Sequence, residues 1–425
     1  MKIIQIIYSL CPGGAEKFVV DLSNQLATMG HDVTLCMLRD VTDESLTFNK
    51  QFLQSNVKLH SMKFSRGFSW GKCRSVEKYI QNERPDVVHC HLNVIPYVYR
   101  LALCCKKIKF FHTLHSVASN TGGTGLQYQL NRLFYNHNWI RPICISKLCK
   151  DSYEDYYKLY NAPFINNGRA LVAASPYYEE TKREVESYKT SPDTRIFIHV
   201  ARFNPLKDQQ LLVDSFNRLN QENIDFTLLV IGSDYDCEEG QKLQQVACSK
   251  IHFLGKKNNV NDYLYCADAF CLTSVYEGLP ISLLEALSCG VTPICTSVGG
   301  IPDVVIDNVS GYLSINRTIS GYMEAVKRFL TYPLPRKELI RYYHKHYSMA
   351  VCAKKYEICQ IEEANKTNSH QFPSFLAKII KFNSNYKRDT ELMFSFDKYK
   401  TNIYAREHSQ INGMTCLIAS RIMKD

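Results

Sequence analysis

No apolar stretch in this sequence is long enough to span a bilayer. Zinc-finger, RNP-like and helix-turn-helix signatures are also lacking, which argues against nucleic acid as a partner. The first apolar run, Ile3 to Tyr8, is too short for a secretory signal and leads directly into Pro12-Gly13-Gly14. We therefore expect a cytoplasmic protein.

The composition is that of a globular protein with a basic balance. The 425 residues include 51 lysines and arginines against 41 acidic residues, a net charge of +10. This excess favours an anionic substrate or an anionic membrane surface. Many of the 17 cysteines, such as Cys36, Cys271 and Cys295, lie in apolar runs. That pattern is typical of buried thiols in a reducing compartment rather than of disulfides.

The stretch from Phe270 to Asp303 predicts a strand, a loop, a helix and a second strand of a parallel sheet. Ligands of such sheets bind beyond the carboxyl ends of the strands. Glu277 falls in the loop, and Glu285 falls in the helix that follows. Backbone N–H groups at the helix start, around Leu279 to Ser282, form a ready site for an anion such as a diphosphate. Together these features suit a nucleotide sugar.

The same stretch resembles the retaining glycosyltransferases of family 4. Their signature is two glutamates separated by seven residues, matched here by Glu277 and Glu285, followed by a glycine pair matched by Gly299-Gly300. The resemblance implies that Glu277 binds sugar hydroxyls and that Glu285 binds the ribose. It adds backbone contacts to the donor from the loop and helix start, at Gly278, Leu279, Pro280, Ile281 and Ser282.

The resemblance covers roughly residues 1 to 360 and implies an α/β fold of the GT-B type. Two doubly wound, Rossmann-like domains then face each other across a cleft, with a C-terminal extension. We expect an acceptor-binding domain, an inter-domain connection, a donor-binding domain, a helix that crosses back and a basic tail, over residues 1–169, 170–193, 194–335, 336–363 and 364–425.

Two further loops carry candidate donor contacts. Arg202 and Lys207 follow a predicted strand, and two cations in one strand-exit loop can both reach a diphosphate. The family uses this pair to stabilise the departing phosphates. Gly13 and Gly14 allow close approach of backbone to a phosphate, and their loop resembles the family's acceptor-domain loop. Gly255 ends a strand that resembles the one whose backbone meets the nucleobase.

Histidines at predicted strand ends could bind a metal or could form hydrogen bonds to the substrate. His89, His91, His112 and His115 are candidate metal ligands, but the sequence does not place their segments together and no acidic ligand lies beside them. In the family a Thr-x-His strand end lies near the sugar, and this implies a hydrogen-bonding role for His115. Asp234-Tyr235-Asp236 reads as a loop rather than a metal motif. We therefore expect neither a metal nor another cofactor.

These features predict a retaining hexosyltransferase that moves a sugar from a nucleotide-diphosphate sugar to a glycan or lipid-linked acceptor, in surface polysaccharide biosynthesis. Glu277, Arg202, Lys207 and His115 are the predicted catalytic residues. Two alternatives remain open, a sugar-nucleotide epimerase of the same fold and a non-catalytic nucleotide-sugar binder. In the tail, Phe372 to Phe382 mixes aromatic residues with lysines and suggests peripheral contact with the inner face of an anionic membrane.

Overall fold

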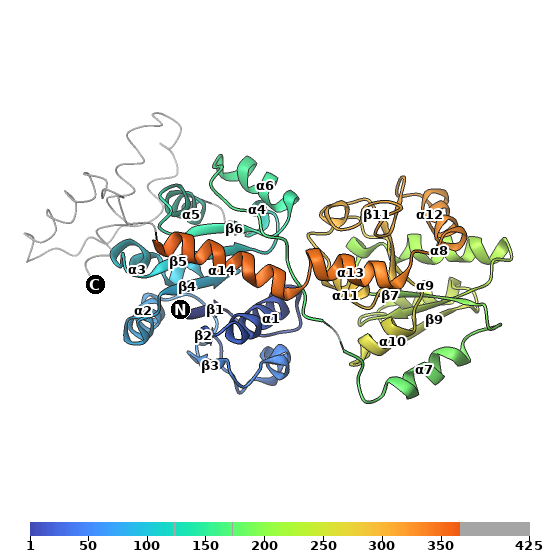
Figure 1. Ribbon diagram of the computed structural model, residues 1–425, viewed down its shortest axis with the longest axis horizontal. Helices are drawn as coiled ribbons and strands as arrows, with labels where there is room; N and C mark the ends of the chain where they lie inside the picture. Colours follow the sequence, from blue (N-terminus) through green and yellow to red (C-terminus); the bar gives the residue numbers. More distant parts are fainter. Residues whose placement is uncertain (122–124, 172, 366–425) are drawn as a thin grey trace, which may run out of the picture.

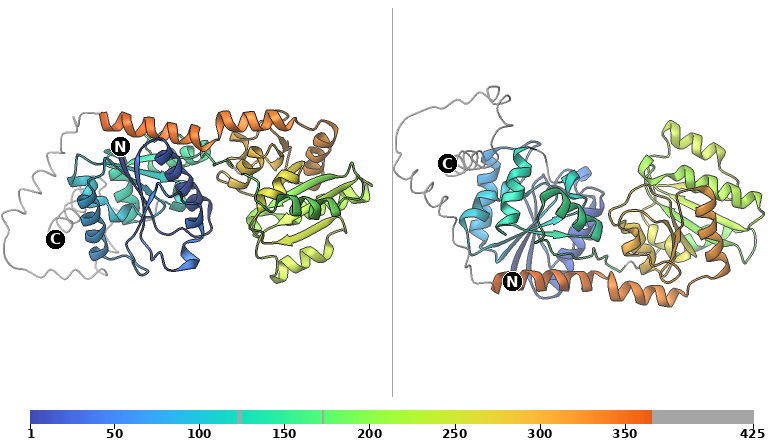
Figure 2. Two further views of the ribbon diagram at one scale, coloured as in Figure 1. Left: turned by 60° about the horizontal axis from the view of Figure 1, so that its bottom comes forward. Right: turned by 90° about the horizontal axis from the view of Figure 1, so that it is seen from above.

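The computed structural model describes residues 1–121, 125–171 and 173–365. The chain forms two lobes side by side, and one pair of consecutive helices runs along both of them (Figures 1 and 2). Each lobe is built on a sheet of six parallel strands. The first lobe holds the sheet of β1 to β6, and the second lobe holds the sheet of β7 to β12.

The first sheet has the strand order β3-β2-β1-β4-β5-β6. Its central strand β1 alternates between the two faces of the sheet, because Ile4 and Ile6 pack into one core while Ile3 and Ile7 pack into the other. Its strands are β1 Lys2–Ile7, β2 Asp32–Met37, β3 Lys58–Ser61, β4 Val87–His91, β5 Lys109–Leu114 and β6 Arg141–Cys144. Its helices are α1 Gly14–Thr28, α2 Trp70–Glu83, α3 Tyr99–Cys104, α4 Ala118–Thr121, α5 Leu126–Asn136 and α6 Lys147–Tyr157.

The second sheet repeats this order as β9-β8-β7-β10-β11-β12. Its strands are β7 Arg195–Val200, β8 Phe226–Ile231, β9 Ile251–Gly255, β10 Ala269–Leu272, β11 Thr292–Thr296 and β12 Tyr312–Ser314. Its helices are α7 Tyr178–Ser187, α8 Gln209–Gln221, α9 Glu238–Val246, α10 Val260–Cys266, α11 Ile281–Ser288, α12 Ile319–Thr331 and α13 Arg336–His346. Both sheets therefore have the doubly wound order, with switch points between β1 and β4 and between β7 and β10. This confirms the predicted fold class.

Short 3₁₀ turns connect several of these elements. They are η1 Glu44–Leu46, η2 Phe48–Phe52, η3 Ile95–Tyr97, η4 Pro205–Lys207 and η5 Ile301–Asp303. The predicted buried thiols Cys36, Cys271 and Cys295 are fully enclosed in the strands, and the cysteines that the structure describes are all free.

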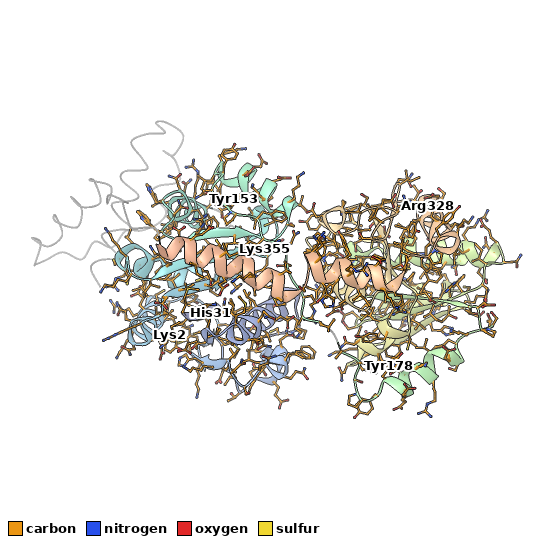
Figure 3. All side chains as sticks on the ribbon, in the orientation of Figure 1. Lys2, His31, Tyr153, Tyr178, Arg328 and Lys355 are labelled. Carbon is orange, nitrogen blue, oxygen red and sulfur yellow. The ribbon has the colours of Figure 1, made fainter. Side chains whose placement is uncertain are left out.

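The chain returns to the first lobe through α14 Met349–Asn365, which packs on α1 and β5. The segment 336–363, predicted as a helix that crosses back, is part of two helices, α13 on the second lobe and α14 on the first (Figure 1). His31 lies beside α14 (Figure 3), and its Nε2 atom is 3.0 Å from a carboxylate oxygen of Glu357. Tyr356 of α14 is buried in the core of the first lobe.

The segment 170–193 is the predicted inter-domain connection. It contains α7, which packs against α10 of the second lobe and buries Val185 in that lobe's core. Thr181 and Val185, one turn apart, are the buried residues of this helix. Most of its other residues are charged, so the helical period is faint in the sequence.

The predicted membrane-contact element Phe372 to Phe382 lies outside the described residues. Within the described ranges, no helix combines the length and apolar character needed to cross a membrane.

Candidate active site

Glu277 lies in the loop that leaves β10, at the switch point of the second sheet. Its side chain is only 8% exposed, and its Oε1 atom accepts hydrogen bonds from Lys207 Nζ at 2.5 Å and from Ser274 Oγ at 2.6 Å. Lys207 follows β7, the neighbour of β10 in the sheet. The two residues are 70 positions apart in the sequence, and strand adjacency brings them together.

The Gly299-Gly300 pair is explained by the close approach of its loop to the Glu277 loop. A Cβ atom on Gly299 would lie 1.8 Å from the carbonyl oxygen of Glu277, and one on Gly300 would lie 1.9 Å from that of Gly278. Gly299 also has a φ of +58°, which side-chain-bearing residues rarely adopt. Gly300 N–H donates to the Glu277 carbonyl at 3.1 Å. The glycines thus fix the backbone that carries the glutamate.

Arg202 and Lys207 share the loop that leaves β7, as predicted, but their environments differ. The Arg202 side chain is exposed and makes no hydrogen bond or ion pair with the part of the chain that the structure describes. Lys207 is held by Glu277, and its backbone carbonyl accepts a hydrogen bond from Thr273 Oγ1 at 3.1 Å. One cation is therefore fixed at the switch point, while the other is available to a ligand.

The first residues of two helices, one from each lobe, lie in contact with each other. A Cβ atom on Gly14, the first residue of α1, would lie 3.3 Å from Cγ1 of Ile281, the first residue of α11. Neither N-cap residue, Gly13 or Pro280, contributes a side-chain hydrogen bond, and the Glu16 carboxylate lies beside Gly13 at the start of α1. The first-turn N–H groups carry the positive ends of both helix dipoles, which favour an anion. Glycine at position 14 permits this approach because it presents no side chain to Ile281.

The predicted donor-binding loop leads into the second of these helix starts. Leu279 and Pro280 are buried, so that they pack the loop against the lobe, and Gly278, Ile281 and Ser282 are partly exposed. Gly255, which ends β9, has a φ of +65°, and its carbonyl accepts a hydrogen bond from Gly232 N–H at 3.0 Å. No contact described in the structure joins Gly255 to Glu277 or Lys207, so a nucleobase contact at this position stays a prediction.

Glu285 has a partner that the sequence did not reveal. Its Oε1 atom accepts hydrogen bonds from Arg169 Nε at 2.9 Å and from Arg169 Nη2 at 2.5 Å. Arg169 Nη1 also donates to Asp21 on α1. Arg169 is 116 residues from Glu285 in the sequence, so no local pattern points to this pair.

The histidine segments do meet, because β4 and β5 are adjacent strands. His91 Nδ1 is 3.0 Å from His115 Nε2, and His91 Nε2 is 2.7 Å from Gln5 Oε1. His89 Nε2 is 2.8 Å from Thr113 Oγ1. The rings therefore bond to protein groups, and the described residues contain no group of three or more histidine, cysteine or acidic side chains placed to hold a metal.

Burial keeps these rings neutral. It lowers the pKa of His115 to about 3, with His112 as a second and smaller cause, and it lowers the pKa of His112 to about 4. His115 is therefore a neutral hydrogen-bonding group near pH 7 rather than an acid. Its ring packs edge-on against Phe18, at 5.4 Å between centroids, one turn along α1 from Gly14. His115 thus lies in the first lobe close to the helix start that faces Ile281.

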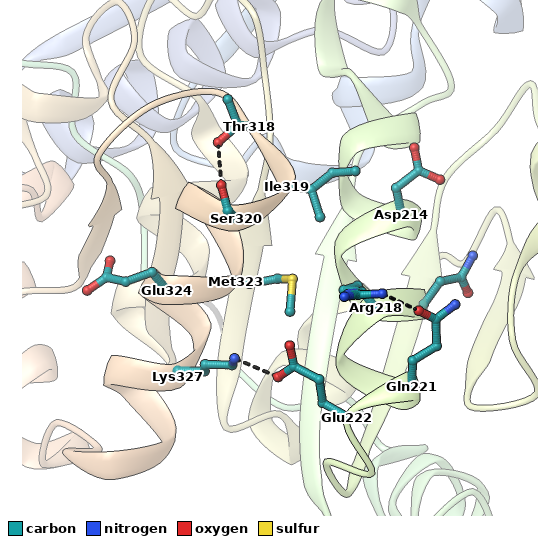
Figure 4. A pocket seen from close by; sticks show the side chains of 11 residues that line it. Asp214, Arg218, Gln221, Glu222, Thr318, Ile319, Ser320, Met323, Glu324 and Lys327 are labelled. Atoms are coloured by element: carbon teal, nitrogen blue, oxygen red, sulfur yellow. Dashed lines mark hydrogen bonds and ion pairs between the residues drawn. The ribbon is translucent and has the colours of Figure 1, made fainter.

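A groove of about 1000 Å³ lies between α8 and α12 of the second lobe (Figure 4). Lys327 pairs with Glu222 inside it at 2.6 Å, and Arg218 donates to Gln221 at 3.0 Å. None of the predicted site residues lines it. The candidate active site is instead the region between the lobes, where Lys207, Glu277 and the two helix starts gather.

Two family models match this chain. The model of glycosyltransferase family 4 matches residues 12–184, and the model of the glycosyl transferases group 1 matches residues 180–346. The chain is 26% identical over 326 residues to N-acetyl-alpha-D-glucosaminyl L-malate synthase of Bacillus anthracis, which covers 71% of this chain and 80% of that protein. It is 24% identical over 272 residues to the UDP-Gal:alpha-D-GlcNAc-diphosphoundecaprenol alpha-1,3-galactosyltransferase of Escherichia coli, covering 60% of this chain and 68% of that enzyme.

Solved structures share the fold at lower identity. A glycosyltransferase from Rickettsia africae superimposes with a TM-score of 0.72 at 16% identity, over 86% of this chain and 99% of its own. Anabaena HepE in complex with UDP and glucose gives a TM-score of 0.68 at 16% identity, over 85% of this chain and 100% of the HepE chain.

Proposed function

Because this chain belongs to family 4 of the glycosyltransferases, we propose that it transfers a hexosyl group from a nucleotide-diphosphate sugar, with retention of anomeric configuration. The acceptor is a glycan or a lipid-linked glycan of surface polysaccharide biosynthesis. The observation that carries this proposal is the approach of the α1 and α11 helix starts to each other, together with Lys207 beside Glu277 in the loop before α11.

The diphosphate of the donor binds where positive charge gathers. The starts of α1 and α11 offer N–H groups, Lys207 offers an ammonium, and the exposed Arg202 offers a guanidinium without a protein partner among the described residues. Negative charge on the leaving diphosphate grows as the glycosidic bond breaks, and fixed donors aimed at that charge lower the barrier. These groups supply the charge that a divalent cation provides elsewhere, so we propose that the transfer needs no metal or other cofactor.

Glu277 and His115 act on the sugar side of the donor. Glu277 is buried and oriented by Lys207 and Ser274, so its second oxygen can accept hydrogen bonds from sugar hydroxyls and stabilise positive charge at the anomeric carbon. His115, kept neutral by burial, gives a hydrogen bond to the sugar or the acceptor. Retention follows if the departing phosphate oxygen takes the acceptor's proton on the same face, as the family resemblance implies, and no protein nucleophile is then required.

The remaining predicted donor contacts complete the site. Glu285 binds the ribose hydroxyls, and backbone groups at Gly255 meet the nucleobase. Gly13 and Gly14 bring the start of α1 against the diphosphate.

The first lobe has a surface loop of exposed aromatic and basic side chains that suits contact with the cytoplasmic face of an anionic membrane. Phe68 and Trp70, before and at the start of α2, are each 52% exposed and pack edge to face at 5.6 Å between centroids. Lys63 and Arg66 are exposed in the same loop. Aromatic rings favour the membrane interface, and basic side chains favour anionic lipid. We propose that this aromatic–basic loop holds the enzyme near a lipid-linked acceptor.

The proposal is tested by incubating the purified protein with a panel of radiolabelled nucleotide sugars, with and without lipid-linked glycan acceptors. A transferase releases nucleoside diphosphate and labels the acceptor. An epimerase changes the donor when no acceptor is present, and a binder leaves every donor intact while its melting temperature rises. Either of the last two results contradicts the transferase proposal.

A further inference from the structure

Arg169 lies at the joint where the chain crosses between the lobes in both directions. Its N–H group donates to the Tyr347 carbonyl at 2.9 Å, and its own carbonyl accepts from Met349 N–H at 2.9 Å and from Tyr343 Oη at 2.5 Å. A Cβ atom on Gly168 would lie 2.5 Å from the Cβ atom of Cys352. The backbone of Arg169 is therefore tied to the junction between α13 and α14, and its side chain starts from a fixed point.

The Arg169 side chain joins one carboxylate from each lobe. Its guanidinium bonds to Asp21 on α1 of the first lobe and to Glu285 on α11 of the second. The Arg169, Asp21 and Glu285 side chains are 8%, 2% and 16% exposed, so water screens these pairs poorly. Lys17 Nζ donates to the other Asp21 oxygen at 2.9 Å, so that two cations balance the two carboxylates.

The geometry leaves one oxygen of Glu285 for a ligand. Arg169 Nε and Nη2 both donate to Oε1, and the structure describes no hydrogen bond to Oε2. The guanidinium restricts where Oε1 can lie, because two donors of one rigid, planar group converge on that oxygen. Oε2 of the same carboxylate keeps its capacity to accept a hydrogen bond from a ligand.

We infer that Arg169 is a positioning residue that orients Glu285 toward the ribose of the donor and makes donor affinity depend on the arrangement of the two lobes. This inference rests on the proposed function, in which Glu285 binds the ribose. Asp21 touches no proposed donor group, yet it holds the other end of the Arg169 side chain. The first lobe therefore contributes to the affinity of the second for its nucleotide.

Loss of Arg169 is expected to weaken nucleotide binding more than it slows the chemical step. Without it, Asp21 keeps Lys17 as a partner, whereas Glu285 loses both described bonds to its side chain and can rotate away. Coupling between linked sites typically changes affinity by about 5- to 150-fold, and we expect Arg169→Met to lower the affinity for the nucleotide by about 10-fold. Asp21→Asn leaves the contact between Arg169 and Glu285 in place but weakens the bond that holds the other end of the Arg169 side chain. We therefore expect the affinity for the nucleotide to fall by about 3-fold.

Calorimetric titration with UDP, GDP, ADP and dTDP identifies the nucleotide that the wild type binds, and the variants are titrated with it. Arg141→Met is the matched control, because Arg141 also forms a largely buried ion pair, with Glu363 of α14, but touches no donor residue. We expect wild-type affinity in this control. In a Glu285→Ala background, which removes the carboxylate that Arg169 holds, Arg169→Met should add no further loss of affinity. In transfer assays, KM for the donor should rise while kcat changes less than about threefold, which a purely structural role would not produce.

The outcomes separate the inference from the function on which it rests. If the wild type binds none of the four nucleotides, the proposed function and this inference both fall. If the wild type binds one and Arg169→Met binds it equally well, or no more weakly than Arg141→Met does, the positioning role is wrong while the proposed function stands. If Arg169→Met does not fold, Asp21→Asn decides, and unchanged affinity in that variant overturns the coupling between lobes.

Discussion

Replacing Lys207 with methionine should affect stability and turnover through different groups. Methionine preserves most of the side-chain volume but removes the ammonium that lies 2.5 Å from Glu277. Breaking a fully buried ion pair costs about 3–5 kcal/mol. Lys207 is 25% exposed and Glu277 keeps its bond to Ser274, so we expect the free energy of unfolding to fall by about 2 kcal/mol.

The effect on turnover should be larger, because Lys207 also faces the leaving diphosphate. Loss of one fixed donor to a developing negative charge typically lowers kcat by about 100- to 1000-fold. The effects of Lys207→Met on stability and on turnover can be separated by adding Glu277→Gln to this variant. The added change should restore stability by removing the unpaired charge, and it should not restore kcat.

The assay is urea unfolding together with transfer at saturating donor and acceptor. Lys242→Met is the matched control, since Lys242 and Glu238 also lie 2.5 Å apart but are 67% and 76% exposed. Surface pairs of this kind contribute little, so this control should keep its stability and its kcat. A kcat for Lys207→Met within threefold of wild type would refute the phosphate role and leave Lys207 as no more than the partner of Glu277.

Three further predictions address other parts of the molecule. Burial lowers the pKa of His112 to about 4 from its ordinary 6.5, so the neutral ring contributes stability above pH 6.5 that is lost as the pH falls toward 4. Between pH 7.5 and 5.5 the wild type should lose about 1.4 kcal/mol more than His112→Asn in urea unfolding, and equal losses would contradict this. Gly299→Ala should lower the melting temperature far more than Gly67→Ala, because both have positive φ but only Gly299 has a carbonyl 1.8 Å from the new Cβ atom. Trp70→Ser should reduce flotation with phosphatidylglycerol vesicles severalfold and leave transfer to a water-soluble acceptor unchanged; equal flotation would remove the aromatic–basic loop from the membrane proposal.

The sequence predicts the central strands of both sheets because these strands contain apolar runs. Val87-Val88 and Phe270 to Leu272 are buried in the centres of their sheets, as such runs require. It also predicts which loops hold Lys207 and Glu277, because a loop that follows a parallel strand must lie at the carboxyl edge of the sheet. Their mutual contact follows only once β7 and β10 are known to be neighbours.

The contacts that the sequence did not predict join residues far apart in the chain. Arg169 is 148 residues from Asp21 and 116 residues from Glu285, and no local pattern marks either pair. The link between His91 and His115 depends on the pairing of β4 with β5. Helix α7 was not predicted, because a short helix with few buried positions shows little periodicity of apolar residues in the sequence.

The central claim is that Lys207, Arg202 and two helix starts bind the diphosphate of a nucleotide sugar. The most direct test compares the affinity of the nucleoside diphosphate chosen by the wild type with that of its monophosphate, in wild type and in Arg202→Met/Lys207→Met. We expect the double variant, which keeps the two helix starts, to lose about 100-fold of the wild-type preference for the diphosphate, because each of the two charge-assisted hydrogen bonds contributes about 1.5–3 kcal/mol. An unchanged preference in the double variant would contradict the account.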